Sequence, residues 1–336
     1  MGKRVLITGA SGFIGSFIVE GALERGYDTW AGMRKSSSRK YLQQQELNFI
    51  TLDFNDKAKL LSQLLDFKKS YGKWDYIVHC AGVTKSKDKD GFYKGNYLAT
   101  VNFIETLEEA DMIPDKFIYI SSLSVFGPIH DSCFMPISEK DTPMPNTAYG
   151  ESKIKTEEYI QNREGFPYVI LRPTGVYGPR EKDYFLMVKS IKQHLDFSVG
   201  FSRQDITFVY VKDVVQAIFL SIEKDIVRRS YFISDEGVYS SRDFSDLIQK
   251  ELGIKGVLHI KCPLFVLKIV SLLSEYSAKL MGKASTLNSD KYKIMKQRNW
   301  RCDITPLKNE LGYEAQYPLN KGVKEIIDWY KKEGWI

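Results

Sequence analysis

The sequence predicts an α/β protein built on a doubly wound parallel sheet, with a smaller α/β lobe interleaved in the chain. Two observations on the first half lead to this fold class. Short apolar runs alternate with longer segments in which apolar residues recur at helical spacing. The short runs are apolar at nearly every position, which is typical of strands buried on both faces of a parallel sheet. A β-α-β-α succession of this kind is characteristic of a sheet with helices on both faces.

The same pattern places each element. The strands are predicted at Val5–Thr8, Thr29–Met33, Phe49–Leu52, Tyr76–His79, Phe117–Ser121 and Tyr168–Arg172. Helical spacing predicts helices at Ile14–Arg25, Asp56–Tyr71, Gly91–Ala110 and Gly150–Glu164. The pattern loosens after Arg172. Later strands are predicted at Thr207–Val211 and Tyr231–Ser234, so we expect the chain to return to the sheet once.

Composition excludes several classes of protein. The chain has 336 residues, 43% of them hydrophobic, which is enough to bury a large core. No apolar run approaches the roughly 18 residues of a membrane span, and no signal peptide is recognisable, so we expect a cytoplasmic protein. The four cysteines form no C-x-x-C pair, and the four histidines show no ligand spacing, so neither a disulfide framework nor a metal site is expected. The net charge of +6 is not concentrated on an aromatic-bearing motif, which argues against nucleic acid.

Three glycines at positions 9, 12 and 15 lie between the first strand and the first helix. Glycine is needed where the backbone turns tightly and where a pyrophosphate approaches the amides, and the helix N-terminus then faces the phosphates. The spacing is G-x-x-G-x-x-G. A lone match of this kind is also met in ordinary loops. The strand before it and the helix after it favour a dinucleotide site.

The segment after the second strand discriminates between dinucleotides. NAD-binding proteins usually carry an acidic residue there for the ribose hydroxyls, whereas the additional phosphate of NADP requires a cation. The chain reads Gly32-Met33-Arg34-Lys35-Ser36-Ser37-Ser38-Arg39-Lys40, without an acid. Arg34 can offer a bidentate fork to a phosphate, and Lys35 or Arg39 can add charge. We therefore expect NADP(H) rather than NAD, with a solvated surface loop as the alternative.

Two further strand ends are candidates for contacts with the adenosine half of the cofactor. Asp53 follows the third strand and is expected to accept a hydrogen bond from the adenine amino group. Ala81 and Gly82 follow the fourth strand and are expected to pass close to the ribose.

A hydroxyl, a phenol and an ammonium are candidates for proton transfer. Tyr149 and Lys153 are four residues apart on a predicted helix and share one face. A nearby ammonium and the nicotinamide charge are expected to bring the tyrosine pKa down from about 10 toward a useful range. Ser122 ends the fifth strand and can hold a substrate oxygen against the phenol. Other Y-x-x-x-K matches begin at Tyr292 and Tyr317, but both lie outside this half and are read as chance.

These motifs resemble the extended short-chain dehydrogenase/reductases, within the NAD(P)-dependent epimerase/dehydratase superfamily, over nearly the whole chain. The matching elements are Thr8-Gly9-x-x-Gly12-x-x-Gly15, Ser121-Ser122-x-x-Val125-Phe126-Gly127, Tyr149-x-x-x-Lys153 and Leu171-Arg172-Pro173-x-x-x-Tyr177-Gly178-Pro179-Arg180. The resemblance implies that Ser122, Tyr149 and Lys153 form a catalytic triad. It implies hydride transfer at nicotinamide C4, with Tyr149 giving or taking the proton, and a bracing role for Asn96.

The resemblance and the strand ends together define the expected site and domains. Cofactor binding is expected at Gly9, Ser11, Gly12, Phe13, Ile14, Gly15, Arg34, Lys35, Arg39, Asp53, Phe54, Ala81, Gly82, Asn96, Tyr149, Lys153, Pro173, Gly175 and Val176. Substrate binding is expected at Thr84, Ser124, Thr174, Tyr177, Arg180 and Arg203. The NADP-binding Rossmann domain is expected over 1–180, with 206–235 returning to it, and the substrate lobe over 181–205 and 236–336.

Two branches of the family remain open. Nucleotide-sugar enzymes generally have an asparagine where this chain has Gly175, and an arginine that grips a diphosphate where it has Ile206. A dehydratase tends to have Asp-Glu where Leu123 and Ser124 follow the serine. These differences favour the branch of 3β-hydroxysteroid dehydrogenase, dihydroflavonol reductase and oxo-sphingolipid reductases. Arg203 is a candidate substitute for the missing arginine, so the sugar reading stays open.

Segment Pro263–Gly282 is apolar apart from a narrow stripe of Lys268, Glu275 and Lys279, and basic residues follow it. One reading is a core helix of the small lobe. The other is a helix that lines an apolar entrance and rests on an anionic membrane surface, through 263–301, at the inner face of the membrane.

The sequence thus predicts an NADP(H)-dependent oxidoreductase that reduces a ketone on a bulky lipid-like molecule, of the 3-ketosphinganine, 3-oxo-ceramide or 3-ketosteroid type. The alternatives are a nucleotide-sugar epimerase or dehydratase with tightly bound NAD(P), and a non-catalytic NADP-sensing protein. By family resemblance the chain is expected to be a monomer, or a homodimer that pairs the helices Gly91–Ala110 and Gly150–Glu164.

Overall fold

The computed structural model describes residues 2–281, 285 and 287–336. By its internal contacts the chain divides into two compact units. The first unit comprises Met1–Ser122, Ala148–Arg172 and Val215–Tyr231, and the second comprises Leu123–Thr147, Pro173–Val214 and Phe232–Ile336. The limits of the expected cofactor domain and substrate lobe stay a prediction.

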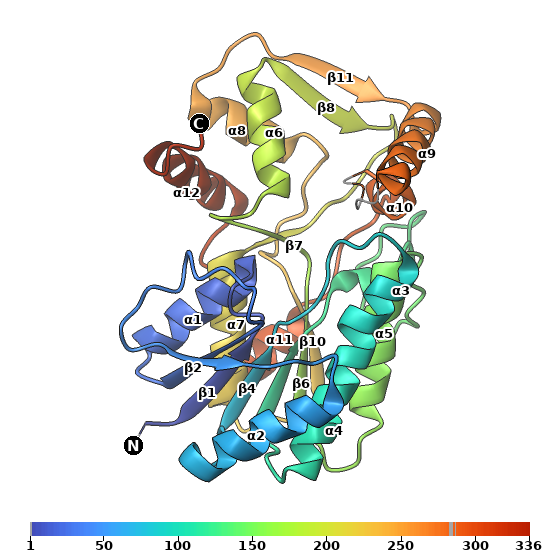
Figure 1. Ribbon diagram of the computed structural model, residues 1–336. Coiled ribbons are helices and arrows are strands. Elements are labelled where there is room, and N and C mark those ends of the chain that lie inside the picture. The colour runs from blue at the N-terminus through green and yellow to red at the C-terminus, as the bar shows by residue number, and fades with distance from the viewer. Residues whose placement is uncertain (1, 282–284, 286) are drawn as a thin grey trace. The chain divides into compact units, whose positions relative to one another are not determined.

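A seven-stranded sheet forms the centre of the first unit, in the order β10-β6-β5-β4-β1-β2-β3 (Figure 1). Neighbouring strands from β6 to β3 pair in parallel. The order reverses between β1 and β4, and ligands of such sheets bind at the carboxyl ends of the strands on either side of this point. The predicted fold class is confirmed. The strands are β1 Arg4–Thr8, β2 Asp28–Met33, β3 Asn48–Thr51, β4 Tyr76–His79, β5 Lys116–Ile120, β6 Tyr168–Pro173 and β10 Arg229–Ile233.

Helices cover both faces of this sheet (Figure 1). On one face, α1 (Phe13–Glu24) packs directly on α7 (Val211–Glu223). The approach at Gly21 is so close that a Cβ there would lie only 2.6 Å from Cγ1 of Val215. The other face carries α2 (Lys57–Tyr71), α4 (Ala99–Glu109) and α5 (Ala148–Gln161). The bounds of α1, α2 and α5 lie within a few residues of the predicted ones, whereas α7 was not predicted.

One predicted helix is interrupted. The segment predicted as Gly91–Ala110 consists of α3 (Lys89–Phe92), a π-helix at Tyr93–Leu98 and then α4. The π-helix contains Asn96. Its side-chain amide accepts a hydrogen bond from the backbone N–H of Val83 and donates one to the carbonyl oxygen of the same residue. Periodicity alone does not reveal such a wide turn, which is found mostly at functional sites.

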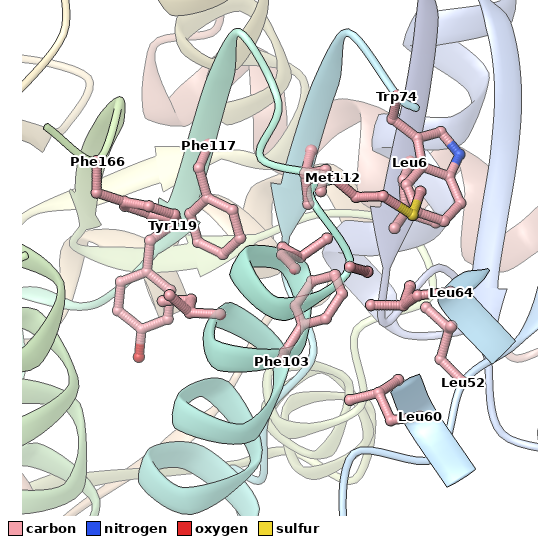
Figure 2. Close-up of a cluster of buried hydrophobic side chains, with 14 of the residues drawn as sticks. Leu6, Leu52, Leu60, Leu64, Trp74, Phe103, Met112, Phe117, Tyr119 and Phe166 are labelled. Carbon is pink, nitrogen blue, oxygen red and sulfur yellow. The ribbon is translucent and has the colours of Figure 1, made fainter. Parts of the chain in front are cut away.

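The burial of apolar side chains between the sheet and the helices α2, α4 and α5 holds the first unit together. Figure 2 shows aromatic and aliphatic side chains from α4, the strands and the loops interdigitating there. Trp74 is completely buried and stacks on Phe67, with ring centroids 3.9 Å apart. Phe103 of α4 lies fully buried in the same cluster. Removing surfaces of this size from water is the main favourable term in folding.

The second unit contains two small parallel sheets and six helices among its described residues. Sheet β7 with β9 comprises Gly175–Tyr177 and Phe208–Tyr210, and sheet β8 with β11 comprises Leu195–Val199 and Leu258–Cys262. The helices are α6 Asp183–Lys192, α8 Asp243–Leu252, α9 Leu264–Leu280, α10 Ser289–Lys296, α11 Thr305–Leu311 and α12 Leu319–Lys332.

Residues 206–235 were expected to return to the large sheet, but only one of their two strands joins it. Tyr231–Ser234 corresponds to β10 at its edge, whereas Thr207–Val211 corresponds to β9, which pairs with β7 instead. The aromatic side chains of this small sheet pack together, and the ring centroids of Tyr177 and Tyr210 lie 5.3 Å apart.

A buried ion pair joins α5 to β6. Arg172 donates to Oε2 of Glu157 through Nη2 at 2.6 Å and through Nε at 3.0 Å. The Glu157 side chain is 0% exposed, and Ser121 donates a hydrogen bond to its other oxygen. A carboxylate so far from water is tolerated only with such partners.

This geometry predicts a large loss of stability for Arg172→Met, which leaves the Glu157 carboxylate without its cation. Breaking a buried pair from one side costs about 3–5 kcal/mol. The matched control is Lys324→Met, which removes an exposed ion pair with Asp328 and should cost less than about 0.5 kcal/mol. Equilibrium urea denaturation followed by circular dichroism compares the two. Equal losses would contradict the assigned role of the pair.

Candidate functional site

The glycine turn between β1 and α1 is too tightly packed for other residues. Gly9 has a φ of 66°, and a Cβ on it would lie 2.7 Å from the amide nitrogen of Ala81. A Cβ on Gly15 would lie 2.2 Å from the carbonyl oxygen of Gly9. Gly12 begins α1 without a side-chain cap, and the first turn of the helix carries no acid. A glycine turn leading into an uncapped helix N-terminus fits the pyrophosphate of a dinucleotide. The candidates Ser11, Phe13 and Ile14 are partly buried in the same turn.

His79 and Thr100, which the sequence did not single out, brace the carboxyl ends of β1 and β4. His79 Nδ1 lies 2.9 Å from Oγ1 of Thr8, and its Nε2 lies 3.0 Å from Oγ1 of Thr100. The amide of Ala81 donates to the same Thr8 oxygen. Burial, with a smaller effect of Lys153, lowers the pKa of His79 to about 3, so this histidine is a neutral brace.

Three of the cations that follow β2 are candidates for cofactor binding. Arg34 and Lys35 are exposed, and neither forms an ion pair with a carboxylate among the described residues. Arg39 lies with its guanidinium 3.9 Å from the ring centroid of Phe49 on β3, which gives it a fixed position. This set can receive a phosphate but has no acid for a ribose diol.

The candidates after β3 have partners of their own. Asp53 accepts a hydrogen bond from Lys59 at 2.9 Å, and this contact lowers the pKa of its carboxyl. Phe54 packs edge-on against His79, with ring centroids 5.7 Å apart. The expected bond from Asp53 to adenine stays a prediction.

The structure brings Ser122, Tyr149 and Lys153 together at the carboxyl end of β5. The hydroxyl groups of Ser122 and Tyr149 are hydrogen-bonded to each other. Lys153 is almost fully buried one turn along α5, and its Nζ lies 6.0 Å from the ring centroid of Tyr149. The ammonium donates to the carbonyl oxygen of Ile120 at 2.8 Å.

The electrostatics of this group differ from the expectation. Burial raises the pKa of Tyr149 to about 12, although the bond with Ser122 opposes the rise. Burial lowers the pKa of Lys153 to about 8, opposed by Cys80 and Glu157. The lysine gives its hydrogen bond to Ile120 and not to the phenol, so the expected lowering of the tyrosine pKa is not found in the chain alone. At neutral pH the arrangement holds a protonated phenol and an ammonium, and it can donate a proton.

The loop after β4 closes one side of this group. Asn96 accepts a hydrogen bond from the amide of Val83 at 2.6 Å and donates to Oγ of Ser152 at 2.8 Å. A Cβ on Gly82 would lie 3.0 Å from the Asn96 amide oxygen and 3.6 Å from Nζ of Lys153. Asn96 therefore links this loop to α5, whereas Thr84 is exposed to solvent.

The other candidates belong to the second unit, where aromatic side chains occupy the space around Gly175. A Cβ at this position would lie 2.8 Å from the hydroxyl of Tyr184 and 3.3 Å from the ring of Phe208. An asparagine side chain would not fit without displacing the tyrosine. Tyr177 has no exposed surface, because it packs into the same aromatic cluster.

The remaining candidates lie at several places in this unit. Ser124 is buried in the 3₁₀ turn Leu123–Val125. The amide of Thr174 donates to Ile233, and Arg180 has a φ of 74° just before α6. Pro173 ends β6 and Val176 lies on β7.

The charge of Arg203 is neutralised by a neighbour. Its Nε and Nη2 donate to the two carboxylate oxygens of Asp205 at 2.7 and 2.8 Å, and the Asp205 side chain is 6% exposed. The guanidinium also lies 4.6 Å from the ring centroid of Phe134. This bidentate contact is the one through which an arginine would otherwise grip a phosphate. Within the described ranges, no three histidine, cysteine or acidic side chains gather to hold a metal ion.

Similar proteins include a sugar epimerase and a sterol dehydrogenase. The chain is 27% identical to a putative UDP-glucose 4-epimerase of Methanocaldococcus jannaschii, over 97% of this chain and 98% of that one. It is 24% identical to a decarboxylating sterol-4-alpha-carboxylate 3-dehydrogenase of Dictyostelium discoideum, over 96% and 100%.

Solved structures share the fold. The UDP-glucose 4-epimerase of Thermotoga maritima with UDP-glucose superposes with a TM-score of 0.78, at 21% identity over 98% of this chain and 99% of that chain. The UDP-glucuronic acid 4-epimerase of Bacillus cereus, in complex with UDP-glucuronic acid and NAD, gives 0.77 at 22% identity over 98% and 99%.

A family model described as the NAD dependent epimerase/dehydratase family matches residues 5–233. The match spans well over half of the chain and includes the glycine turn, the switch in strand order and α5. This chain therefore belongs to the NAD-dependent epimerase/dehydratase family and is an enzyme of the extended short-chain dehydrogenase/reductase type.

Proposed function

We propose that this enzyme uses NADP(H) to reduce a ketone on a bulky, lipid-like molecule to a secondary alcohol. The observation that carries the substrate class is the bidentate pairing of Arg203 with the buried Asp205. Arg203, the candidate substitute for the missing diphosphate clamp, is already paired with a carboxylate. A charged diphosphate here would compete with the Asp205 carboxylate for the guanidinium fork of Arg203, whereas an apolar ligand makes no such demand.

The residues of the first unit fit a nicotinamide dinucleotide. Only glycine can occupy positions 9 and 15, and the N-terminus of α1 favours phosphate. The exposed Arg34 and Lys35, with no acid after β2, favour the phosphate of NADP over the free ribose of NAD. When bound, the reduced cofactor would supply a hydride to the carbonyl carbon.

The chain's own residues would handle the oxygen and its proton. The Ser122 hydroxyl would donate a hydrogen bond to the ketone oxygen and orient it toward Tyr149. The Tyr149 phenol, protonated at neutral pH, would give its proton to that oxygen as the carbinol forms. The Lys153 ammonium would favour the negative charge that develops on the tyrosine oxygen. Hydride and proton together convert the ketone to the alcohol, and the cofactor leaves oxidised.

Two further observations support a lipid-like substrate. Gly175 offers no side-chain amide for a sugar, and the hydroxyl of Tyr184 and the ring of Phe208 occupy the space that an asparagine would need. The sterol-4-alpha-carboxylate 3-dehydrogenase relatives act, by their name, on a lipid, and the one from Dictyostelium discoideum matches almost end to end.

A nucleotide-sugar epimerase is the second candidate. The relative from Methanocaldococcus jannaschii and the similar solved structures favour it. An enzyme of that kind returns its hydride to the substrate and consumes no cofactor overall. A non-catalytic NADP sensor would not need the assembled Ser122, Tyr149 and Lys153.

Net cofactor consumption separates the two enzymes. With 3-ketosphinganine or a 3-ketosteroid we expect one NADPH to be oxidised per alcohol formed, with NADH a poorer donor. UDP-glucose and dTDP-glucose should cause no NADPH oxidation and no change of the sugar. Conversion of a nucleotide sugar without any turnover of lipid ketones would overturn the proposal.

Tyr149→Phe removes the proposed proton donor and keeps the ring. Loss of a general acid typically costs about 10²–10⁴-fold in rate, so kcat should fall by at least about 100-fold while the affinity for NADPH stays unchanged. Single-turnover NADPH oxidation and NADPH fluorescence titration measure the two quantities. Tyr71→Phe removes an exposed hydroxyl as a matched control. Retained activity in Tyr149→Phe would rule out the proton-donor role.

The pH dependence of ketone reduction should follow the titration of the Lys153 ammonium. Its pKa of about 8 means that the ammonium is present below that pH and is lost above it. The Tyr149 phenol, with a pKa of about 12, stays protonated throughout the accessible range. We expect kcat/KM, which reports the free enzyme, to be level below pH 8 and to fall about tenfold per pH unit above it. A rate that rises through this range would contradict the assignment.

A further inference from the structure

Helix α9 turns its large apolar side chains away from the unit that it belongs to. The residues that it buries are Leu267, Ser271 and Ala278, which recur at helical spacing and form one stripe. The opposite side is exposed, with Phe265 at 68% and Leu280 at 72%. We define the α9 apolar face by its exposed members Phe265, Ile269, Leu272, Leu273, Tyr276 and Leu280. A soluble helix usually has the reverse arrangement.

This exposure is concentrated. Of the twenty large apolar side chains that are exposed among the described residues, nine lie within Leu264–Met281. Phe201, 71% exposed, follows Gly200, and a Cβ on that glycine would lie 3.7 Å from Leu264 at the start of the helix. Single exposed apolar residues need no explanation, but a continuous patch marks an interaction surface.

Positive charge accompanies the patch. Residues 261–298 contain eight basic and two acidic side chains, so their net charge of +6 equals that of the whole chain. Lys268 and Lys279 are exposed along one edge of the helix, and in the described part of the chain neither forms an ion pair. Glu275 accepts hydrogen bonds from both the amide and the hydroxyl of Ser289.

The length of the helix limits how it can meet a bilayer. No helix in the described ranges is both long and apolar enough to cross a membrane. Helix α9 has 17 residues, and Lys268, Glu275 and Lys279 interrupt it. An apolar face bordered by lysines is typical of helices that lie in the plane of the interface. Face-to-face contact with a second copy would bring two such basic surfaces together, which is electrostatically unfavourable.

We propose that the α9 apolar face docks onto an anionic lipid bilayer, with the helix parallel to the surface and its lysines contacting the head groups. Such binding needs both the insertion of the apolar face and the attraction of the lysines to anionic head groups, because each contribution is modest alone. The proposal does not depend on the proposed ketone reduction, since it concerns the protein without cofactor or substrate.

Vesicle flotation of the purified full chain tests the proposal. The probes are phosphatidylcholine vesicles with and without about 30% phosphatidylglycerol. We expect at least tenfold stronger binding to the anionic vesicles, and weaker binding at about 1 M salt, where charges are screened. The variant Phe265→Gln/Leu272→Gln/Leu280→Gln should lose this binding by at least tenfold. The matched control Leu65→Gln/Leu186→Gln/Val238→Gln changes exposed apolar residues elsewhere and should bind like the unchanged protein.

The substitutions are all at exposed positions, so circular dichroism should show both triple variants folded. Lys268→Gln/Lys279→Gln should weaken binding to the anionic vesicles only. No binding by the unchanged protein, or undiminished binding by the α9 variant, would overturn the proposal. Sedimentation that shows a dimer abolished by the α9 substitutions, without vesicle binding, would assign the face to a second copy instead.

Discussion

Two charges buried one helical turn apart on α5 fix this helix against the sheet. The Lys153 ammonium is held by the carbonyl oxygen of Ile120, and the Glu157 carboxylate is held by Arg172 and Ser121. A buried charge is tolerated only with such partners. These partners lie at the end of β5 and on β6, directly beside Ser122. The contacts that satisfy the charges therefore also hold the serine next to Tyr149.

Local constraints made much of the first unit predictable. The glycine turn requires its residue type at each close approach, and Tyr149 and Lys153 share a face through helical geometry alone. What depends on partners distant in the chain was not predictable. The residues around Asn96 do not predict a π-helix, because the wide turn depends on the contacts of Asn96 with Val83 and Ser152. Glu157 follows Lys153 at the same four-residue spacing, so the sequence predicts that it shares the face of Lys153. Its pairing with Arg172 was not predictable, because it depends on how α5 packs against β6. The raised pKa of Tyr149 likewise depends on burial, which spacing cannot report.

The second unit shows the limit of pattern reading most clearly. The sequence shows that α9 is apolar over most of its surface but does not say which side meets the protein, and the α9 apolar face is exposed to solvent. Arg203 looked available in sequence because Asp205, only two residues away, need not have formed a bidentate pair with it. This pair and the aromatic side chains around Gly175 support the proposed lipid-like ketone over a nucleotide sugar as the substrate. The result favours an apolar substrate.

The central claim is that a hydride passes to a ketone carbon and stays there. Reaction of 3-ketosphinganine with NADPH deuterated at both C4 positions, followed by mass spectrometry of the alcohol, tests it directly. The account predicts one deuterium per product molecule, on the carbinol carbon. Alcohol without deuterium, or recovery of unchanged ketone beside an epimerised nucleotide sugar, would contradict it.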